Sequence, residues 1–267
     1  FAEFGRAAYV WGHPHWHTGL MVLVLLATGL LMRGVARVRQ WPQMALASLA
    51  VLPGLALVAL SDAATGPSSP FMPSHDLGLL AWPLALAWHL WALRRWPAEA
   101  PVGAVRTATH VGGLWLFTAL AALELVARVQ ALSLSGTAWL ELSAVAVLAA
   151  VLYGLSRPGM AQRWPVRDVP SAYLEVAALP LVALSGLWLM AAGLLSAGDA
   201  APLPYVPLLN PLELGLAGVI LTLLQWQGAL PADSRWRLPQ GLGLKLVAAA
   251  GLGLLTGMVL RACHHWA

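Results

Sequence analysis

Charged side chains are scarce in this chain of 267 residues: it has 15 Lys and Arg and 11 Asp and Glu, which together make up only 10% of the sequence. A soluble globular domain carries roughly 25% charged residues, so this chain has too little charge to cover a water-facing surface. The formal net charge is +4, but the basic residues stand between apolar stretches and form no basic patch. We therefore expect no nucleic acid partner.

Cysteine and lysine are also nearly absent, because Cys263 and Lys245 are the only examples of each. A single cysteine excludes an internal disulfide and leaves the redox compartment open. The sequence contains no Walker loop, dinucleotide glycine fingerprint, His-Glu-x-x-His or Gly-x-Ser-x-Gly motif. It thus identifies neither a catalytic residue nor a cofactor, and whether the protein is an enzyme stays open.

Apolar residues, in contrast, make up 60% of the chain and gather in long runs. A helix that spans a bilayer needs about 20 mostly apolar residues. The runs are Trp16–Met32, Met44–Leu60, Leu77–Leu93, Thr107–Ala127, Ala138–Ser156, Ser171–Leu195, Pro211–Gly228 and Leu242–Leu260. They predict an all-α polytopic transmembrane bundle of about eight helices, arranged as four hairpins in a single domain over residues 1–267.

The basic residues predict how this bundle is oriented. Twelve of the fifteen fall on odd-numbered connections between the runs: Arg33, Arg37, Arg39, Arg94, Arg95, Arg106, Arg157, Arg163, Arg167, Arg235, Arg237 and Lys245. Cytoplasmic loops of membrane proteins carry an excess of Lys and Arg. We therefore expect a multi-pass protein of the bacterial inner membrane, with odd-numbered connections in the cytoplasm and both termini of this chain in the periplasm.

Four of these connections place Arg beside Trp with Pro close behind. They are Arg39-Gln40-Trp41-Pro42, Arg94-Arg95-Trp96-Pro97, Gln162-Arg163-Trp164-Pro165 and Arg235-Trp236-Arg237-Leu238-Pro239. One interpretation is a duplicated helical hairpin. The other is common interface chemistry, in which Arg meets lipid phosphate and Trp lies at headgroup depth. We favour the second, because the helices themselves share little sequence.

Histidines gather at the predicted outer face and suggest a metal or proton-handling site that faces the periplasm. Those placed there are His13, His15, His17, His75, His264 and His265, the last two directly after Cys263. Imidazole and thiolate are common metal ligands. The alternative is that His, like Trp, simply suits a wet interface. No spacing matches a known ligand signature, so the presence of a metal stays unknown.

Carboxylates and arginines complete the candidate outer-face cluster. Glu124 and Arg128 are one helical turn apart near the outer interface, which favours a paired boundary residue over a proton relay. Ser74 resembles a helix cap before Asp76, although His75 and Asp76 also suit general acid–base chemistry. The full cluster is His13, His15, His17, His75, Asp76, Glu124, Arg128, Arg261, His264 and His265.

Glu213 has a local explanation that requires no function. The segment Asn210-Pro211-Leu212-Glu213 predicts the start of a helix, with Asn210 as N-cap, proline at the first helical position and Glu213 as the capping-box acid at the third.

Several motifs in order resemble a known family. They are Leu80-Ala81-Trp82-Pro83-Leu84-Ala85, His110 with Gly113-Leu114-Trp115-Leu116, Glu124, Pro207-Leu208-Leu209-Asn210-Pro211-Leu212-Glu213 and Arg261-Ala262-Cys263-His264-His265-Trp266. From Leu77 to its end, the chain resembles the C-terminal part of large bacterial membrane proteins catalogued as domain of unknown function 2339. The resemblance implies an envelope protein with many helices and no established activity. Because such proteins are long, we expect this chain to be a fragment of a longer one.

Three functions fit these observations. We favour a scaffold or accessory subunit of a cell-envelope assembly, because the sequence has interfacial Trp and few interior charges. The second is an envelope enzyme or flippase that handles a lipid-linked or glycan substrate at a periplasmic cleft. The third is a metal- or cofactor-binding membrane protein that uses the outer histidines. The expected partners are membrane lipids, other membrane subunits or the remainder of a longer chain.

Overall fold

The computed structural model of the chain describes residues 16–65, 71–96 and 103–266, and all regular secondary structure in these ranges is helical. The chain groups into two compact units, unit 1 (Phe1–Glu124) and unit 2 (Leu125–Ala267). Helix α6 (Ala104–Ala131) crosses the boundary between them. The predicted polytopic helical bundle is confirmed.

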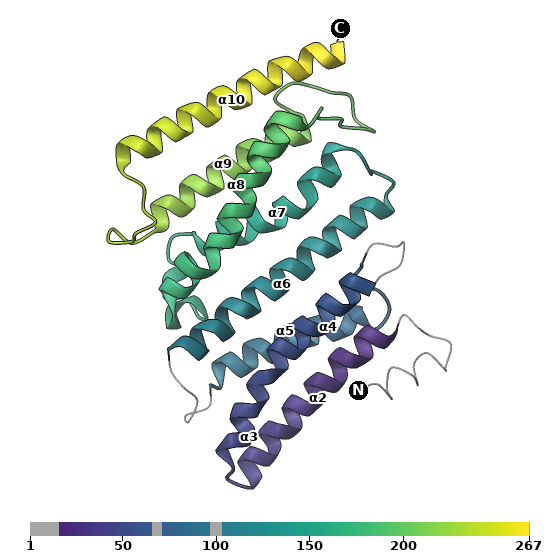
Figure 1. Cartoon of the computed structure of the whole chain (residues 1–267), viewed down its shortest axis with the longest axis vertical. Helices are drawn as coiled ribbons and strands as arrows, with labels where there is room; N and C mark the ends of the chain where they lie inside the picture. Colours follow the sequence, from purple (N-terminus) through teal and green to yellow (C-terminus); the bar gives the residue numbers. More distant parts are fainter. Residues whose placement is uncertain (1–15, 66–70, 97–102, 267) are drawn as a thin grey trace. The chain divides into compact units, whose positions relative to one another are not determined.

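Unit 1 consists of packed helices that run back and forth (Figure 1). Besides the first part of α6, its helices are α2 (Trp16–Val38), α3 (Pro42–Ala47), η1 (Ser48–Ala50), α4 (Val51–Thr65) and α5 (Gly78–Arg94). Its core includes Val22, Leu55 and Trp88. A side chain at Gly29 would lie 2.8 Å from Val51 and 2.9 Å from Trp88, so glycine lets these helices approach closely.

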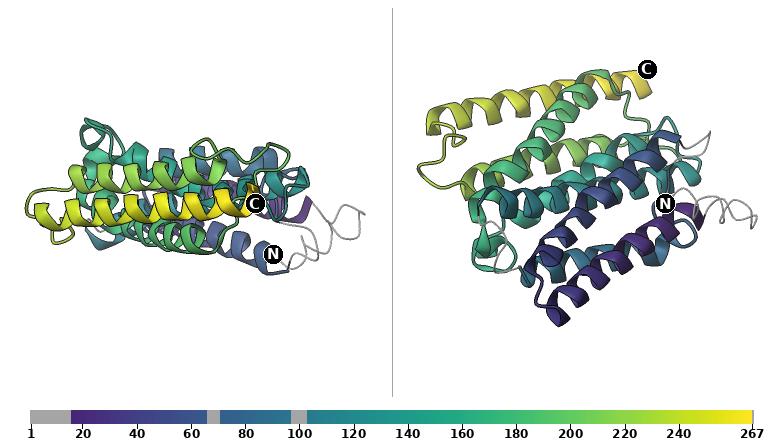
Figure 2. Two further views of the ribbon diagram at one scale, coloured as in Figure 1. Left: turned by 90° about the horizontal axis from the view of Figure 1, so that it is seen from above. Right: turned by 60° about the horizontal axis from the view of Figure 1, so that its bottom comes forward.

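Unit 2 contains the last part of α6 and all the helices that follow it. They are α7 (Ala138–Leu155), η2 (Met160–Gln162), η3 (Val166–Asp168), η4 (Ala172–Ala177), α8 (Ala178–Leu195), α9 (Pro211–Ala229) and α10 (Gln240–Trp266). Helices α7, α8 and α9 pack against one another, whereas α10 contacts only α8 and α9 to an appreciable extent. Figures 1 and 2 both show α10 at the edge of this unit.

The helices are long enough to cross a bilayer. Seven helical segments in the described residues combine the required length with high hydropathy. The one remaining predicted run, Leu77–Leu93, forms α5, which has 17 residues. At 1.5 Å per residue, α5 is about 25 Å long, near the lower limit for crossing a hydrocarbon core of about 30 Å.

Prolines explain two irregular stretches inside the predicted runs. Pro53 falls in the first turn of α4, and the run that contains it is divided into α3, η1 and α4. Pro180 falls in the first turn of α8, directly after the π-helical η4. Proline lacks a backbone N–H and collides with the preceding turn. A regular α-helix is therefore interrupted just before each proline.

Within each unit, the arginine-bearing connections share one end. In unit 1, Nη1 of Arg33 donates to the carbonyl of Arg95 at 2.8 Å, which joins the first and third connections. In unit 2, the α7–α8 and α9–α10 connections lie at one end and the α8–α9 connection at the other (Figure 1). This agrees with the predicted alternation. The side of the membrane that each end faces stays a prediction.

Candidate functional site

The start of α9 organises the polar residues of unit 2. Oδ1 of Asn210 accepts a hydrogen bond from the backbone N–H of Leu212 at 2.8 Å, and its Nδ2 donates to the carbonyl of Gly198 at 2.7 Å. The predicted N-cap is thus confirmed, with Pro211 at the first helical position. Glu213 consequently lies in the first turn, where the helix dipole favours a negative charge.

The Glu213 carboxylate is buried and holds the preceding loop. Only 2% of the residue is exposed. Oε1 accepts a hydrogen bond from the Tyr205 hydroxyl at 2.5 Å, and Oε2 accepts one from the backbone N–H of Leu208 at 2.5 Å. The sequence predicted a capping acid, and the carboxylate does occupy the first turn, but these two bonds go to the loop before the helix.

Arg261 of α10 faces the same carboxylate. It is 5% exposed, and its Nε lies 3.6 Å from Oε1 of Glu213. Its Nη1 also donates to the carbonyl of Gly193 in α8, at 3.4 Å. These contacts connect the ends of α8, α9 and α10. Sequence reasoning placed Arg261 in the outer-face cluster but did not pair it with Glu213.

Gly198 makes room for this arrangement. Its φ of +70° lies in the left-handed region, and a side chain there would approach Cδ of Arg261 to 2.9 Å. Glycine is the residue that adopts this conformation without strain. The α8–α9 connection can therefore pass close to the Arg261 side chain.

Tyr205 and His265 lie beside Glu213 and Arg261, and we call these four residues the Glu213–Arg261 cluster. Their rings stack with centroids 4.5 Å apart, and Nε2 of His265 lies 2.9 Å from the carbonyl oxygen of Ala197. Burial, together with the hydrogen bond to Glu213, raises the pKa of Tyr205 to about 12. The phenol therefore stays protonated above pH 10, where a free tyrosine loses its proton, and continues to donate to the carboxylate.

The Glu213–Arg261 cluster is suited to joining helix ends rather than to catalysis, because its carboxylate is buried and already has partners. Both oxygens of Glu213 already accept hydrogen bonds, and the residue is almost fully buried. A carboxylate acting on a substrate must reach the proton that it transfers. The main result of the arrangement is that α10 is anchored at its C-terminal end.

Metal binding finds no support in the described residues, where no three His, Cys, Asp or Glu side chains are placed to hold an ion. Cys263 and His264 are exposed on the last turn of α10. His17 is exposed at the start of α2. The candidates His13 and His15 lie outside the described residues.

The outer-face candidates of unit 1 form two short contacts. The hydroxyl of Ser74 donates to Oε1 of Glu124 at 2.5 Å, and the Ser74 backbone N–H donates to Oε2 at 2.9 Å. The predicted capping role of Ser74 is wrong, because α5 has Leu77 as its N-cap with no side-chain cap. Nδ1 of His75 lies 2.8 Å from Asp76, and their side chains are 56% and 35% exposed.

The residues of the predicted cluster belong to both units, although Glu124 and Arg128 lie one turn apart on the same helix, α6. Unit 1 holds His17, His75, Asp76 and Glu124, while unit 2 holds Arg128, Arg261, His264 and His265. Within unit 2, the rings of His264 and His265 are 5.2 Å apart. Arg128 is exposed on α6. The partners that sequence reasoning missed, Ser74 for Glu124 and Glu213 for Arg261, are distant in sequence.

Two histidines inside the apolar runs were also missed as candidates. His89 of α5 and His110 of α6 are only 3% and 1% exposed. A side chain at Gly113 would come within 2.0 Å of Nε2 of His89, so this glycine gives the imidazole its space. The signal in the sequence was the presence of an ionisable residue within a membrane run, which is often functional.

Comparison with known proteins gives one family. The family model described as "Predicted membrane protein (DUF2339)" matches residues 5–267, and so extends well beyond the resemblance seen from Leu77 onward. No curated protein and no solved structure matches the chain.

Proposed function

The chain belongs to this family of predicted membrane proteins, and on that premise we propose that it is an inner-membrane scaffold or accessory subunit of a cell-envelope assembly. In this role α10 provides the contact surface. Its partner is an apolar helix of another membrane subunit.

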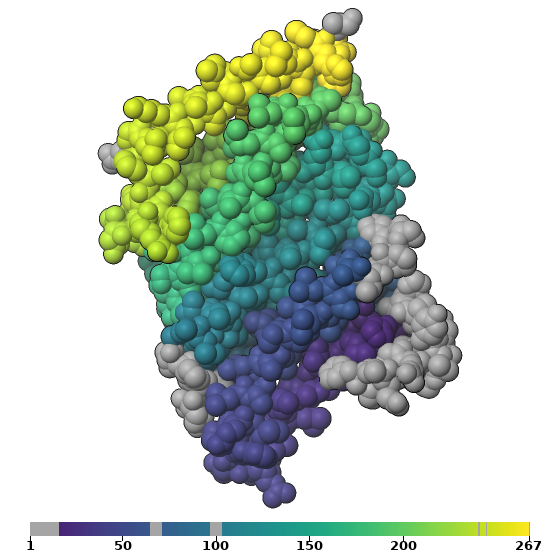
Figure 3. All heavy atoms as spheres, in the orientation of Figure 1, coloured from purple at the N-terminus to yellow at the C-terminus, as the bar shows by residue number. Residues whose placement is uncertain are grey.

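The exposure of α10 is the observation that carries the proposal. Only 6% of its membrane segment is buried within the chain, against 22–33% for the other six candidate spans. In the space-filling view, α10 (yellow) covers one edge of unit 2 and leaves its outer side open (Figure 3). A helix that buries so little of its surface against its own unit has most of that surface available to another helix.

The composition of α10 fits an apolar helical partner. Between Lys245 and Arg261 it has no charged residue. Side chains added at Gly251 or Gly253 would meet nothing within 4 Å. Glycine in a helix costs about 0.5–1 kcal/mol relative to Ala, and in membranes small residues allow helix backbones to approach closely. A partner helix packed against Gly251 and Gly253 would explain why glycine occupies these positions.

The closed Glu213–Arg261 cluster supports the same role. It fixes the C-terminal end of α10 to α8 and α9 without any contribution from a ligand. An edge helix that is anchored at one end is a suitable surface for assembly.

Site-specific photocrosslinking in native membranes tests the proposal. A photoreactive residue at Leu252 or Val259 of α10 should form a discrete adduct with one membrane protein. The same residue at Leu187 of α8, which is similarly exposed at 67%, should label lipid only. Identical lipid labelling at all three positions would contradict the proposal.

A pair of glycine substitutions adds a functional readout. Gly253→Leu fills the open space on α10 and should reduce co-purification of the crosslinked subunit by about tenfold, because the larger side chain keeps the two helix backbones apart. Gly186→Leu on α8 also fills open space and is the matched control. If the complex tolerates both changes equally, α10 is not the contact surface.

A second candidate, an envelope enzyme or flippase for a lipid-linked or glycan substrate, is favoured by the exposed His75–Asp76 pair beside the Ser74–Glu124 hydrogen bonds. Asp76 holds His75 at 2.8 Å in the manner of an oriented acid–base pair. Asp76→Asn should then abolish the ability of the protein to complement a deletion strain, while the α10 complex stays intact. Normal function of this variant would remove the candidate.

A further inference from the structure

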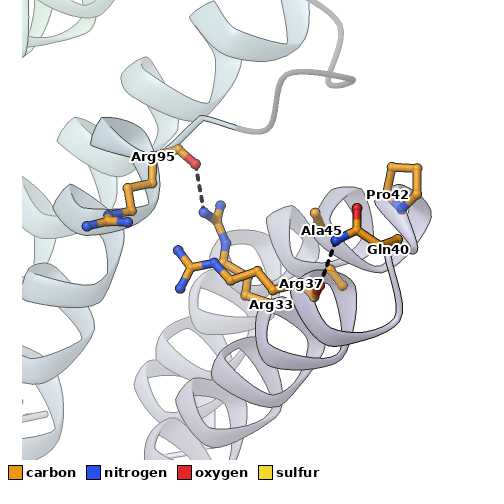
Figure 4. Close-up of a pocket in the computed structure, with 7 residues that line it drawn as sticks. Arg33, Arg37, Gln40, Pro42, Ala45 and Arg95 are labelled. Atoms are coloured by element: carbon orange, nitrogen blue, oxygen red, sulfur yellow. Dashed lines mark hydrogen bonds between the residues drawn. The ribbon is translucent and has the colours of Figure 1, made fainter.

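A small basic pocket lies in unit 1 where α2 ends and α3 begins. Its volume is about 230 Å³, and its described polar lining residues are Arg33, Arg37, Gln40 and Arg95. No acidic side chain is among the described residues that line it. Figure 4 shows the guanidinium groups of Arg33 and Arg37 near each other, with that of Arg33 pointing to the backbone carbonyl of Arg95.

Arg33 is the buried element of this pocket. The residue is only 6% exposed, and it is held by neutral oxygens: Nε donates to Oγ of Ser48 at 3.0 Å and Nη1 to the carbonyl of Arg95 at 2.8 Å. Its Nη2 has no hydrogen-bond partner among the described residues. A buried charge without a counterion is costly. The two hydrogen bonds thus fix the Arg33 guanidinium in place, and its Nη2 is left to bind an anion.

Arg37 supplies the exposed element. Its guanidinium carbon lies 5.9 Å from the centre of the Trp91 ring, and that of Arg33 lies 5.1 Å from the same ring. Such cation–π contacts hold each guanidinium against a flat apolar wall. Gln40 completes the rim, since its Nε2 donates to the carbonyl of Arg37 at 3.3 Å.

The described carboxylates of unit 1 lie elsewhere. Asp62 lies in the last turn of α4, Asp76 lies just before α5, and Glu124 bonds Ser74 close by. The end of α4 and the start of α5 lie at the end of unit 1 opposite the end of α2, where the pocket is (Figure 1). No described acid is therefore available to neutralise Arg33 and Arg37.

Phosphate is the anion that suits these groups. Guanidinium offers a planar fork of donors that matches phosphate oxygens, and two such groups fit a group with several oxygens and more than one negative charge. Lipid phosphates lie at the ends of membrane helices, where this pocket opens. Its volume is below the roughly 300–1,000 Å³ of sites for drug-sized ligands, which favours a small anionic group.

We infer that the pocket formed by Arg33 and Arg37 binds a phosphate group, carried by an anionic lipid headgroup or free in water. This inference does not depend on the scaffold role of α10. The lipid and the free anion share the chemistry that the pocket recognises, and binding experiments distinguish them.

The test uses the full chain in nanodiscs. One arm compares phosphatidylglycerol with phosphatidylcholine and measures lipid retained by native mass spectrometry after transfer to detergent. The other titrates inorganic phosphate into phosphatidylcholine nanodiscs and measures binding by calorimetry. Retention of phosphatidylglycerol assigns the headgroup as ligand, and saturable binding of inorganic phosphate assigns the free anion. Failure in both arms overturns the inference.

Matched variants locate the site. Arg37→Gln removes an exposed charge and leaves the buried interior intact, while Arg33→Lys keeps the charge but loses the fork. Each should weaken binding about tenfold or more, as expected for a lost charge-assisted hydrogen bond. Arg39→Gln changes an exposed arginine of the same connection outside the pocket lining and should change binding less than about twofold. An equal loss in Arg39→Gln would reduce the effect to general surface charge and overturn the inference.

Discussion

Arg33 in unit 1 and Arg261 in unit 2 are buried to almost the same extent, 6% and 5% exposed, but their partners differ. Arg261 faces the Glu213 carboxylate at 3.6 Å. Arg33 is held by a hydroxyl and a carbonyl, with no described acid in its pocket. Burial alone therefore does not define the role of an arginine in this protein. The role depends on the counterion: Glu213 compensates the charge of Arg261 within the fold, whereas the charge of Arg33 is available to a ligand.

The largest expected effect is that of Arg261→Met, which leaves the Glu213 carboxylate buried without its cation. Loss of one partner of a buried pair costs about 3–5 kcal/mol. Equilibrium unfolding in mixed micelles measures the free energy. The double variant with Glu213→Gln should recover most of the loss, because no charge is then left buried. Equal values for the single and double variants would show that the ion pair is not what stabilises this end of α10.

Gly198→Ala should come next, because it strains the backbone and pushes on the Arg261 side chain. A non-glycine residue in the left-handed region costs about 1–3 kcal/mol. Gly136→Ala is the matched control, since Gly136 also has a positive φ, of +81°, but a side chain there meets nothing within 4 Å. The same unfolding assay should show a larger loss for Gly198→Ala. Indistinguishable losses would mean that contact with Arg261 adds nothing to the strain.

Arg33→Met should be milder than Arg261→Met, at about 1 kcal/mol, because it strands no buried charge. The Ser48 hydroxyl keeps its own hydrogen bond to the carbonyl of Ala45, at 2.6 Å. Thermal unfolding of both methionine variants in one detergent provides the comparison. A loss for Arg33→Met as large as that for Arg261→Met would mean that Arg33 is a structural residue like its counterpart.

The smallest effect is spectroscopic and concerns only the unit 2 cluster. The pKa of Tyr205 is raised from 10 to about 12 by burial and by Glu213. A raised pKa means that the neutral phenol stabilises the fold fully below pH 10 and that this contribution is lost as the pH rises through about 12. The ultraviolet difference between wild type and Tyr205→Phe isolates its titration. A midpoint near pH 10 would show that the cluster is open to water.

The sequence predicted the features that depend on local composition. Each apolar run is helical in the structure, and Asn210 caps α9 as expected. Long stretches of Leu, Val and Ala in lipid have few alternatives to a helix, because every backbone group must be satisfied within the chain. The Asn210 cap could be predicted because it depends on only four adjacent residues.

The partners of the polar residues could not be predicted in the same way. Ser74 bonds Glu124, and Glu213 faces Arg261, across long stretches of sequence. The burial of Arg33 depends on Ser48 and on the Arg95 carbonyl, which only helix packing brings together. From sequence alone, Arg33 was simply one of several arginines at a membrane surface. Which helices pack against one another is the missing information in all three cases.

Site-directed labelling across the membrane is the most direct test of the account, which depends on a bundle whose arginine-bearing ends all face the cytoplasm. In a Cys263→Ser background, Arg39→Cys reports on the first connection and Leu203→Cys on the α8–α9 connection. A membrane-impermeant maleimide applied to intact spheroplasts should label Leu203→Cys at once and Arg39→Cys only after the membrane is opened. Labelling of both from outside, or of Arg39→Cys alone, would contradict the account.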